Sequence, residues 1–89
     1  MADIDYDPAK SNQVYQRHGF TLGYASRIFD GPVWEWQSPV PGEHRIRAMG
    51  YVDDRAITVI YTWRGNTRRI VTARPARRAE RHGYASQKS

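Results

Sequence analysis

Hydrophobic and polar positions in the first third of the chain follow the period of α-helices. Asp7 followed by Pro8 predicts a helix start, because the aspartate can accept a first-turn N–H and proline lacks a donor that this turn leaves unbonded. We expect a helix over about residues 8–17. It should end at His18 and Gly19, because a histidine cation opposes the carbonyl end of the dipole and glycine tolerates the left-handed conformation.

A second helix is expected directly afterwards, with Thr21 as its cap. Its apolar positions recur at three- and four-residue spacing, which places them on one helical face: Leu22, Ala25, Ile28 and Phe29. The sequence Asp30-Gly31-Pro32 should stop it, because glycine and proline are strong breakers.

From Val33 onward, apolar and polar residues alternate or form short β-branched runs, which is typical of strands. The predicted strands cover residues 33–37, 44–52, 56–63 and 67–73. The third is nearly continuously apolar, so we expect it at the centre of the sheet with both faces covered. Asp53-Asp54 and Gly65-Asn66 should form the turns between neighbouring antiparallel strands.

The last part of the chain predicts one short helix. Pro75 can open it, Arg81 lies near its end, and Gly83 should terminate it, which leaves residues 85–89 as a frayed tail. The element order gives an α+β fold with two N-terminal helices, a four-stranded antiparallel sheet and a short C-terminal helix. Eighty-nine residues suffice for a single domain, residues 1–89.

Charge is unevenly distributed along the chain. Residues 1–60 hold six Lys or Arg against eight Asp or Glu, whereas residues 61–89 hold eight Lys or Arg against Glu80 alone. A basic third composed almost entirely of arginine favours a nucleic-acid partner, because the guanidinium holds phosphate through two parallel hydrogen bonds. A solvated surface or a docking face for an acidic protein is the alternative.

Composition also excludes several classes of function. The chain has no cysteine, so disulfides, thiolate zinc sites and cysteine nucleophiles are excluded. No apolar run is long enough to cross a bilayer, and the acidic N-terminus does not resemble a signal peptide. We therefore expect a cytoplasmic protein without membrane contact.

Three groups of motifs, in order, resemble the BrnT family of type II toxins, whose usual pattern runs D-P-x-K, K-H-G, G-E-x-R, T-x-R-G and I-I-S-A-R with a downstream R-x-E. The matching segments cover nearly the whole chain: Asp7-Pro8-Ala9-Lys10, Arg17-His18-Gly19, Gly42-Glu43-His44-Arg45, Thr62-Trp63-Arg64-Gly65, Ile70-Val71-Thr72-Ala73-Arg74 and Arg78 with Glu80. The chain departs from the pattern at Val14, Arg17, Thr72 and Pro75.

The resemblance implies a RelE-like fold and a ribonuclease that inhibits translation and growth without a metal or other cofactor. It also implies neutralisation by a BrnA-like ribbon-helix-helix antitoxin, through which the complex binds operator DNA. Toxin and antitoxin would form a heterotetramer.

RNA supplies its own nucleophile, the 2′-hydroxyl beside the scissile phosphate, so the protein must position it, move protons and stabilise the phosphorane. Arginines suit the last task because charge develops on the non-bridging oxygens. The candidates are Arg45, Arg64 and Arg74, which match the motifs and lie on or at the end of predicted strands. Alternatively, these arginines lie on an exposed strand face or form ion pairs with Asp53, Asp54 and Glu43.

Candidates for proton transfer are His18, Glu43 and Glu80, with Tyr84 as a further possibility. Imidazole changes charge near neutral pH, which suits this role, but His18 can equally serve only to stabilise the helix end. Glu80 can instead pair with Arg77 three residues earlier on the helix.

The remaining candidates are expected to bind RNA: Arg68, Arg69, Arg77, Arg78 and Tyr84. Trp34, Trp36 and Trp63 can stack on bases, although tryptophans more often pack in cores or at partner interfaces. Two other interpretations remain open at this point, a nucleic-acid-binding module without catalysis and a protein-interaction domain with a basic docking face.

Overall fold

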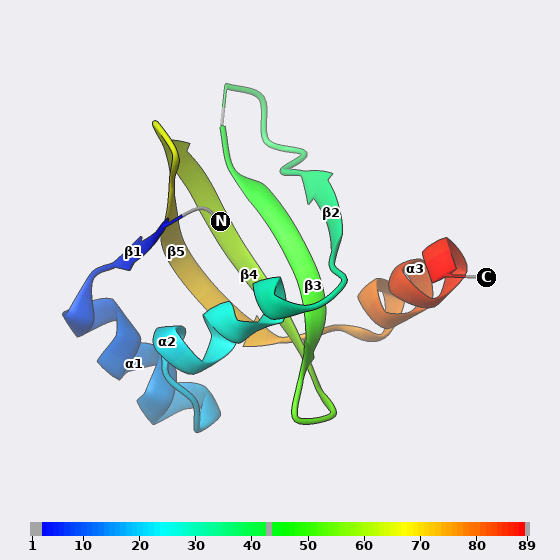
Figure 1. Ribbon diagram of the computed structural model, residues 1–89, viewed down its shortest axis with the longest axis horizontal. Coiled ribbons are helices and arrows are strands. Elements are labelled where there is room, and N and C mark those ends of the chain that lie inside the picture. The colour runs from blue at the N-terminus through cyan, green and yellow to red at the C-terminus, as the bar shows by residue number, and fades with distance from the viewer. Residues whose placement is uncertain (1–2, 43, 89) are drawn as a thin grey trace.

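The computed structural model describes residues 3–42 and 44–88 and shows an α+β fold (Figure 1). The helices are α1 (Pro8–His18), α2 (Leu22–Ala25), the 3₁₀ helix η1 (Ser26–Asp30) and α3 (Arg78–Lys88); the strands are β1 (Asp3–Tyr6), β2 (Trp34–Gln37), β3 (Ile46–Val52), β4 (Arg55–Arg64) and β5 (Thr67–Pro75). Within the described residues, no helix has the length and apolarity needed to span a bilayer.

The predicted helix ends are confirmed by hydrogen bonds. Asp7 Oδ1 accepts the N–H of Ala9 at 2.9 Å, and Thr21 Oγ1 accepts the N–H of Tyr24 at 3.0 Å. Gly19 has a φ of 82° and ends α1 in the left-handed conformation. The second predicted helix is divided, because α2 tightens into η1 after one turn and then stops at Gly31.

The sheet has five strands in the order β1-β5-β4-β3-β2, so the prediction of four antiparallel strands was wrong. The four predicted strands are present and antiparallel, but β1 adds a parallel partner to β5 and makes the sheet mixed. This strand has only four residues, two of them acidic, so its pattern is too short to predict. Its place depends on β5, where Asp5 lies opposite Arg69 and forms a 2.7 Å ion pair with it.

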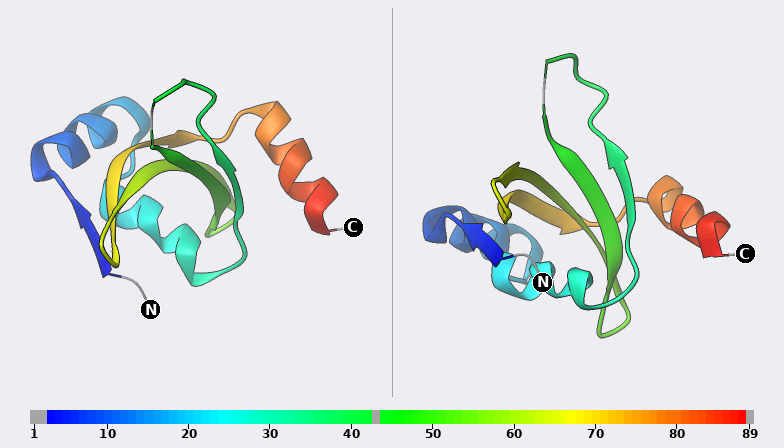
Figure 2. Two further views of the ribbon diagram at one scale, coloured as in Figure 1. Left: turned by 90° about the horizontal axis from the view of Figure 1, so that it is seen from above. Right: turned by 45° about the horizontal axis from the view of Figure 1, so that its top comes forward.

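One face of the sheet, which we call the helix-covered face, packs against α1, α2 and η1 (Figure 2). Its core combines helix residues with alternate residues of the strands: Val14, Leu22, Ala25, Ile28, Ala48, Ile57, Val59, Tyr61, Ile70 and Ala73. Strand β4 is buried from Ile57 to Tyr61, in agreement with its predicted central position.

The opposite face, which we call the open face, is covered only at one end. There α3 packs on Met49 with Ala76 and Tyr84. Ile57 and Val59 point to the helix-covered face. Because side chains alternate along a strand, Thr58 and Ile60 point to the open face.

A β-bulge between β4 and β5 decides which arginines reach the open face. The register shifts at Ile60/Tyr61, so Tyr61 lies opposite Ile70 while Ile60 lies opposite Thr72. A bulge inserts one residue and changes the phase of the strand beyond it. Arg74 is therefore on the open face, whereas Arg68 is on the helix-covered face although both have even numbers.

Helix α3 differs from its prediction. The predicted start at Pro75 was wrong, because Pro75 ends β5 and α3 begins at Arg78. The predicted end at Gly83 was also wrong, because the helix runs on to Lys88 through residues 85–88, which were expected to fray. Gly83 is needed for packing, because a Cβ atom at this position would overlap the Trp34 ring. The glycine lets the helix approach the tryptophan closely.

Gly83→Ala should therefore destabilise the protein, even though alanine favours helices by about 1 kcal/mol. Overpacking of this kind costs about 1–3 kcal/mol, so we expect a net loss in the free energy of unfolding, measured in urea. Gly31→Ala is the control, because nothing lies within 4 Å of its Cβ position. A Gly83→Ala variant as stable as the parent chain would show that Trp34 moves aside freely.

Candidate functional site

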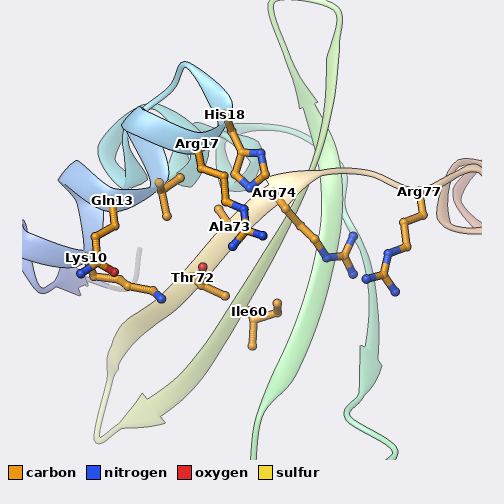
Figure 3. Close-up of a pocket in the computed structure, with 10 residues that line it drawn as sticks. Lys10, Gln13, Arg17, His18, Ile60, Thr72, Ala73, Arg74 and Arg77 are labelled. Atoms are coloured by element: carbon orange, nitrogen blue, oxygen red, sulfur yellow. The ribbon is translucent and has the colours of Figure 1, made fainter.

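A pocket with a volume of about 440 Å³ lies between α1 and β5 (Figure 3). Its lining combines one side of α1 with residues of β4 and β5, most of them on the open face, and the residue before α3: Lys10, Gln13, Val14, Arg17, His18, Ile60, Thr72, Ala73, Arg74 and Arg77. Among the described residues that line it, Lys10, Arg17, Arg74 and Arg77 are cations and none is a carboxylate. We call it the α1 pocket. Its charge suits a polyanion.

A second pocket of about 410 Å³ shares Lys10 with the first and continues along β5. It is lined by Asp7, Lys10, Arg45, Thr62, Arg64, Arg69, Ile70 and Val71. We call it the hairpin pocket, because it lies toward the β4–β5 turn. Together the two pockets form a basic track that runs along β5 beside α1.

Arg74 is held in a fixed position by Glu80. Its Nη1 and Nη2 donate to the two carboxylate oxygens of Glu80, each at 2.7 Å, so the guanidinium and carboxylate form a two-bond fork. Both side chains are largely buried, with exposed fractions of 17% for Arg74 and 10% for Glu80. Arg74 therefore enters the α1 pocket with little freedom to move.

Glu80 has two further donors. Thr58 Oγ1 and the N–H of Arg77 each donate to Glu80 Oε1 at 2.8 Å. The second bond caps the start of α3, as a glutamate in its first turn can do. Burial alone raises the pKa of Glu80, but the hydrogen bonds from Arg74, Arg77 and Thr58 outweigh burial and lower the pKa to about 2. Glu80 thus stays ionised at neutral pH.

This lowered pKa predicts an acid-sensitive fold. The stability that ionised Glu80 contributes is present above its ordinary pKa of 4.5 and is lost as the pH falls through about 2. Urea unfolding at pH 7, 4 and 3 should show a steeper loss of stability for the parent chain than for Glu80→Gln. Asp54→Asn is the control, because it removes a different carboxylate. Its free energy of unfolding should fall with pH as steeply as that of the parent chain. If the free energy of unfolding fell equally steeply with pH in the parent chain and in Glu80→Gln, ionised Glu80 would not be the stabilising group.

The structure brings together six of the predicted site residues. His18, Arg74 and Arg77 line the α1 pocket, and Arg45, Arg64 and Arg69 line the hairpin pocket. The alternative pairing of Glu80 with Arg77 takes a different form, because Glu80 accepts the backbone N–H of Arg77 and not its guanidinium. Glu43 lies outside the described residues.

Three other predicted residues lie elsewhere. Arg68 packs over the Phe29 ring at 4.2 Å and the Trp63 ring at 4.8 Å, on the helix-covered face. Arg78 lies on the outer side of α3. Tyr84 is 9% exposed and packs edge-on against Tyr51 beneath α3.

Sequence reasoning did not select Lys10, Gln13 and Arg17 for the site, although they line the α1 pocket. They recur at three- and four-residue spacing on α1, so they form one polar stripe. This stripe was the available signal. Whether such a stripe faces solvent or a site depends on how the helix docks, which the pattern does not contain.

The position of His18 is compatible with either role considered for it. It lies in the last turn of α1, its ring stacks on Phe20 with 5.9 Å between centroids, and it lines the α1 pocket near Arg74. Among the described residues, no three His, Cys, Asp or Glu side chains are grouped so that they could hold a metal ion.

Comparisons with known proteins identify a family and a similar fold. Residues 6–80 match the sequence model of a family described as "Ribonuclease toxin, BrnT, of type II toxin-antitoxin system". The fold is similar to a 1.1 Å crystal structure of the Brucella abortus ribonuclease toxin BrnT, with a TM-score of 0.64 over 88% of this chain and 100% of that chain. The two sequences are 20% identical, so this likeness shows the fold. No curated protein sequence matched the chain significantly.

Proposed function

This chain belongs to the BrnT family of ribonuclease toxins of type II toxin-antitoxin systems, and on that premise we propose that it is a single-domain endoribonuclease which cleaves RNA in the α1 pocket. Acting in the cytoplasm, it inhibits translation and growth until an antitoxin neutralises it. The observation that carries the proposal is a pocket in which Arg74, fixed by Glu80, shares the lining with His18, and whose described lining residues include no carboxylate.

Cleavage proceeds by attack of the 2′-oxygen of the RNA on the adjacent phosphorus. The 2′-hydroxyl loses its proton, the bond from phosphorus to the 5′-oxygen breaks, and that oxygen gains a proton. The products are a 2′,3′-cyclic phosphate and a 5′-hydroxyl end. This reaction needs a proton carrier and cationic donors, both of which the lining of the α1 pocket supplies without a metal ion.

His18 is the proton carrier in this proposal, because it lines the α1 pocket and imidazole is the side chain that most often acts as a general acid or base. Glu80 is a poor base, since a carboxylate with a pKa of about 2 has little affinity for a proton. Its hydrogen bonds to Arg74 make it a positioning residue instead.

Arg74 stabilises the phosphorane, since a donor held rigidly before the reaction costs no reorganisation during it. Lys10 and Arg17 add positive charge from the α1 side of the pocket. Arg45 and Arg64 in the hairpin pocket bind phosphates of neighbouring nucleotides and set the direction of the strand.

The partner that the family implies is an antitoxin. We propose a BrnA-like ribbon-helix-helix protein that covers the basic track, forms a heterotetramer with the toxin and carries the operator-DNA contacts of the complex. A cover over these cations would exclude RNA from them.

The test is induced expression of the parent chain and of an Arg64→Ala, Arg74→Ala variant, each with and without the neighbouring small protein. We expect growth arrest and RNA cleavage only when the parent chain is expressed without the neighbouring protein. Cleavage by the purified parent chain should persist in EDTA. Intact RNA with well-folded, RNA-binding protein would move the assignment to a nucleic-acid-binding module without catalysis. Loss of cleavage in EDTA would refute the metal-free mechanism.

A further inference from the structure

Two tryptophans form a stack at the edge of the open face. The Trp34 and Trp36 rings lie 4.5 Å apart between centroids and are tilted by 33°. Trp34 is clamped from one side by Gly83 of α3, against which its ring packs directly. Both indoles pack against the cluster under α3 and remain partly exposed. The stack is thus fixed at one end.

The strand register places Trp36 in a row that leads to the α1 pocket. Trp36 lies opposite Arg47, Arg47 opposite Ile60, and Ile60 opposite Thr72. Ile60 and Thr72 line the α1 pocket. With strands about 4.8 Å apart, the row extends roughly 14 Å from Trp36 to Thr72. Trp36 is therefore too far away to touch a phosphate reacting in the pocket, but it lies within reach of an adjoining nucleotide.

Arg47 occupies the middle of this row, and no described residue pairs with its charge. Its Nε is buried and has no hydrogen-bond partner, and no ion pair joins Arg47 to another described residue. The carboxylate of β2 does not serve it, because Glu35 accepts a hydrogen bond from Tyr61 on the helix-covered face. A partly buried guanidinium without a counterion is costly, so its surroundings suit an anion supplied by a ligand.

We propose that Trp36 and Arg47 form a nucleotide-binding subsite for single-stranded RNA beside the α1 pocket, with a base stacked on Trp36 and a phosphate on Arg47. The proposal rests on the proposed function for its choice of RNA. A base would extend the Trp34–Trp36 stack by one ring. Bases in a duplex are already stacked on both sides, so the subsite selects an unpaired nucleotide.

Trp63 offers a matched contrast within the same chain. It is 43% exposed, but it lies on the helix-covered face, where Arg68 already covers its ring and Tyr61 meets it edge-on. Exposure alone therefore does not define the subsite. What distinguishes Trp36 is the combination of a fixed stack, an unpaired neighbouring cation and continuity with the basic α1 pocket.

The experiment measures binding separately from cleavage. A short single-stranded oligonucleotide with 2′-O-methyl groups at every position cannot be cleaved, and its binding is followed by quenching of tryptophan fluorescence and by a titrated Kd. Trp36→Leu should weaken binding roughly 10- to 100-fold and remove most of the quenching, as expected for the loss of one stacked base. Trp36→Phe should retain most of the affinity, and Trp63→Phe should stay within twofold of the parent chain.

A set of oligonucleotides with one abasic position each identifies the stacked base. Removing the base at one position should weaken binding to the parent chain and leave binding to Trp36→Leu unchanged. Arg47→Gln should lower the slope of log K against log salt by roughly 0.7, the loss of one phosphate contact to a single strand. Parent-like binding by folded Trp36→Leu, or an abasic scan of the parent chain without a costly position, would overturn the subsite.

These outcomes separate the subsite from the proposed function. Stacking at Trp36 in a protein that cleaves no RNA would keep the subsite and remove the nuclease assignment. If Trp36→Leu cleaves and binds RNA like the parent chain, the nuclease assignment stands and the subsite is wrong. If Trp36→Leu does not fold, Trp36→Phe and the abasic scan of the parent chain decide.

Discussion

Arg74→Ala should lower the rate constant for RNA cleavage by about 10²–10³-fold, the usual effect of removing one preorganised donor to a developing oxyanion. Arg74 enters the α1 pocket and is held there by two 2.7 Å bonds to Glu80. Arg74→Lys should recover little activity, because an ammonium cannot reproduce the two-bond fork. Single-turnover cleavage of a labelled RNA measures the effect.

The control for Arg74→Ala is Arg78→Ala, which removes the same charge from the outer side of α3. It should stay within a few fold of the parent chain. Arg74→Ala also leaves Glu80 buried with fewer partners, so its thermal unfolding must be recorded, and rates compared well below its melting temperature. Parent-like cleavage by folded Arg74→Ala would remove Arg74 from the mechanism.

Glu80→Gln separates positioning from chemistry at the same place. The amide keeps the shape of the carboxylate but loses the charge that fixes Arg74. We expect a smaller fall in the rate constant than for Arg74→Ala, with the dissociation constant for uncleavable RNA nearly unchanged. A complete loss of activity in stably folded Glu80→Gln would indicate instead that Glu80 acts directly on a proton.

His18→Gln should lower the rate constant by about 10²–10⁴-fold, the range for loss of a general acid or base. The pH–rate profile should also lose an inflection, because the group that moves the proton in the parent chain has been removed. His82→Gln on the outer side of α3 is the matched control and should leave both rate and profile unchanged.

The profile distinguishes catalysis from a purely structural role for His18. If His18 only stabilises the end of α1 and packs on Phe20, His18→Gln should lower the melting temperature while the profile keeps its shape. A folded variant with the parent inflection would therefore assign proton transfer to another group.

Local structure followed from local sequence wherever one or two residues fix the backbone. The bonds from Asp7 and Thr21 to nearby N–H groups require only a short polar side chain at the right position. The turn at Asp53 and Asp54 adopts φ values of 50° and 66°, which aspartate tolerates better than most residues. Tyr24 and Arg27 then hold Asp53, so Asp53 is not available to the site arginines considered as its partners.

The arginines could be counted but not placed from the sequence. A regular strand would put Arg68 and Arg74 on one face, and only the bulge opposite Ile60 and Tyr61 separates them. Arg68 consequently stacks on Phe29 and Trp63 away from the basic track. The bulge exists because Ile70 and Ala73 both enter the same core, a demand of packing rather than of local preference.

By itself, the sequence determined the α+β class, the four antiparallel strands, the capped first helix, the basic C-terminal third and the motifs of a ribonuclease toxin family, because each depends on short-range pattern or composition. The tertiary structure decided the parallel strand β1, the passage of α3 through Gly83 and the partner of Glu80. These depend on contacts between segments far apart in the chain: Asp5 with Arg69, and Trp34 with Gly83. These contacts stabilise the protein only once the sheet and helices have packed, so short-range sequence patterns do not predict them.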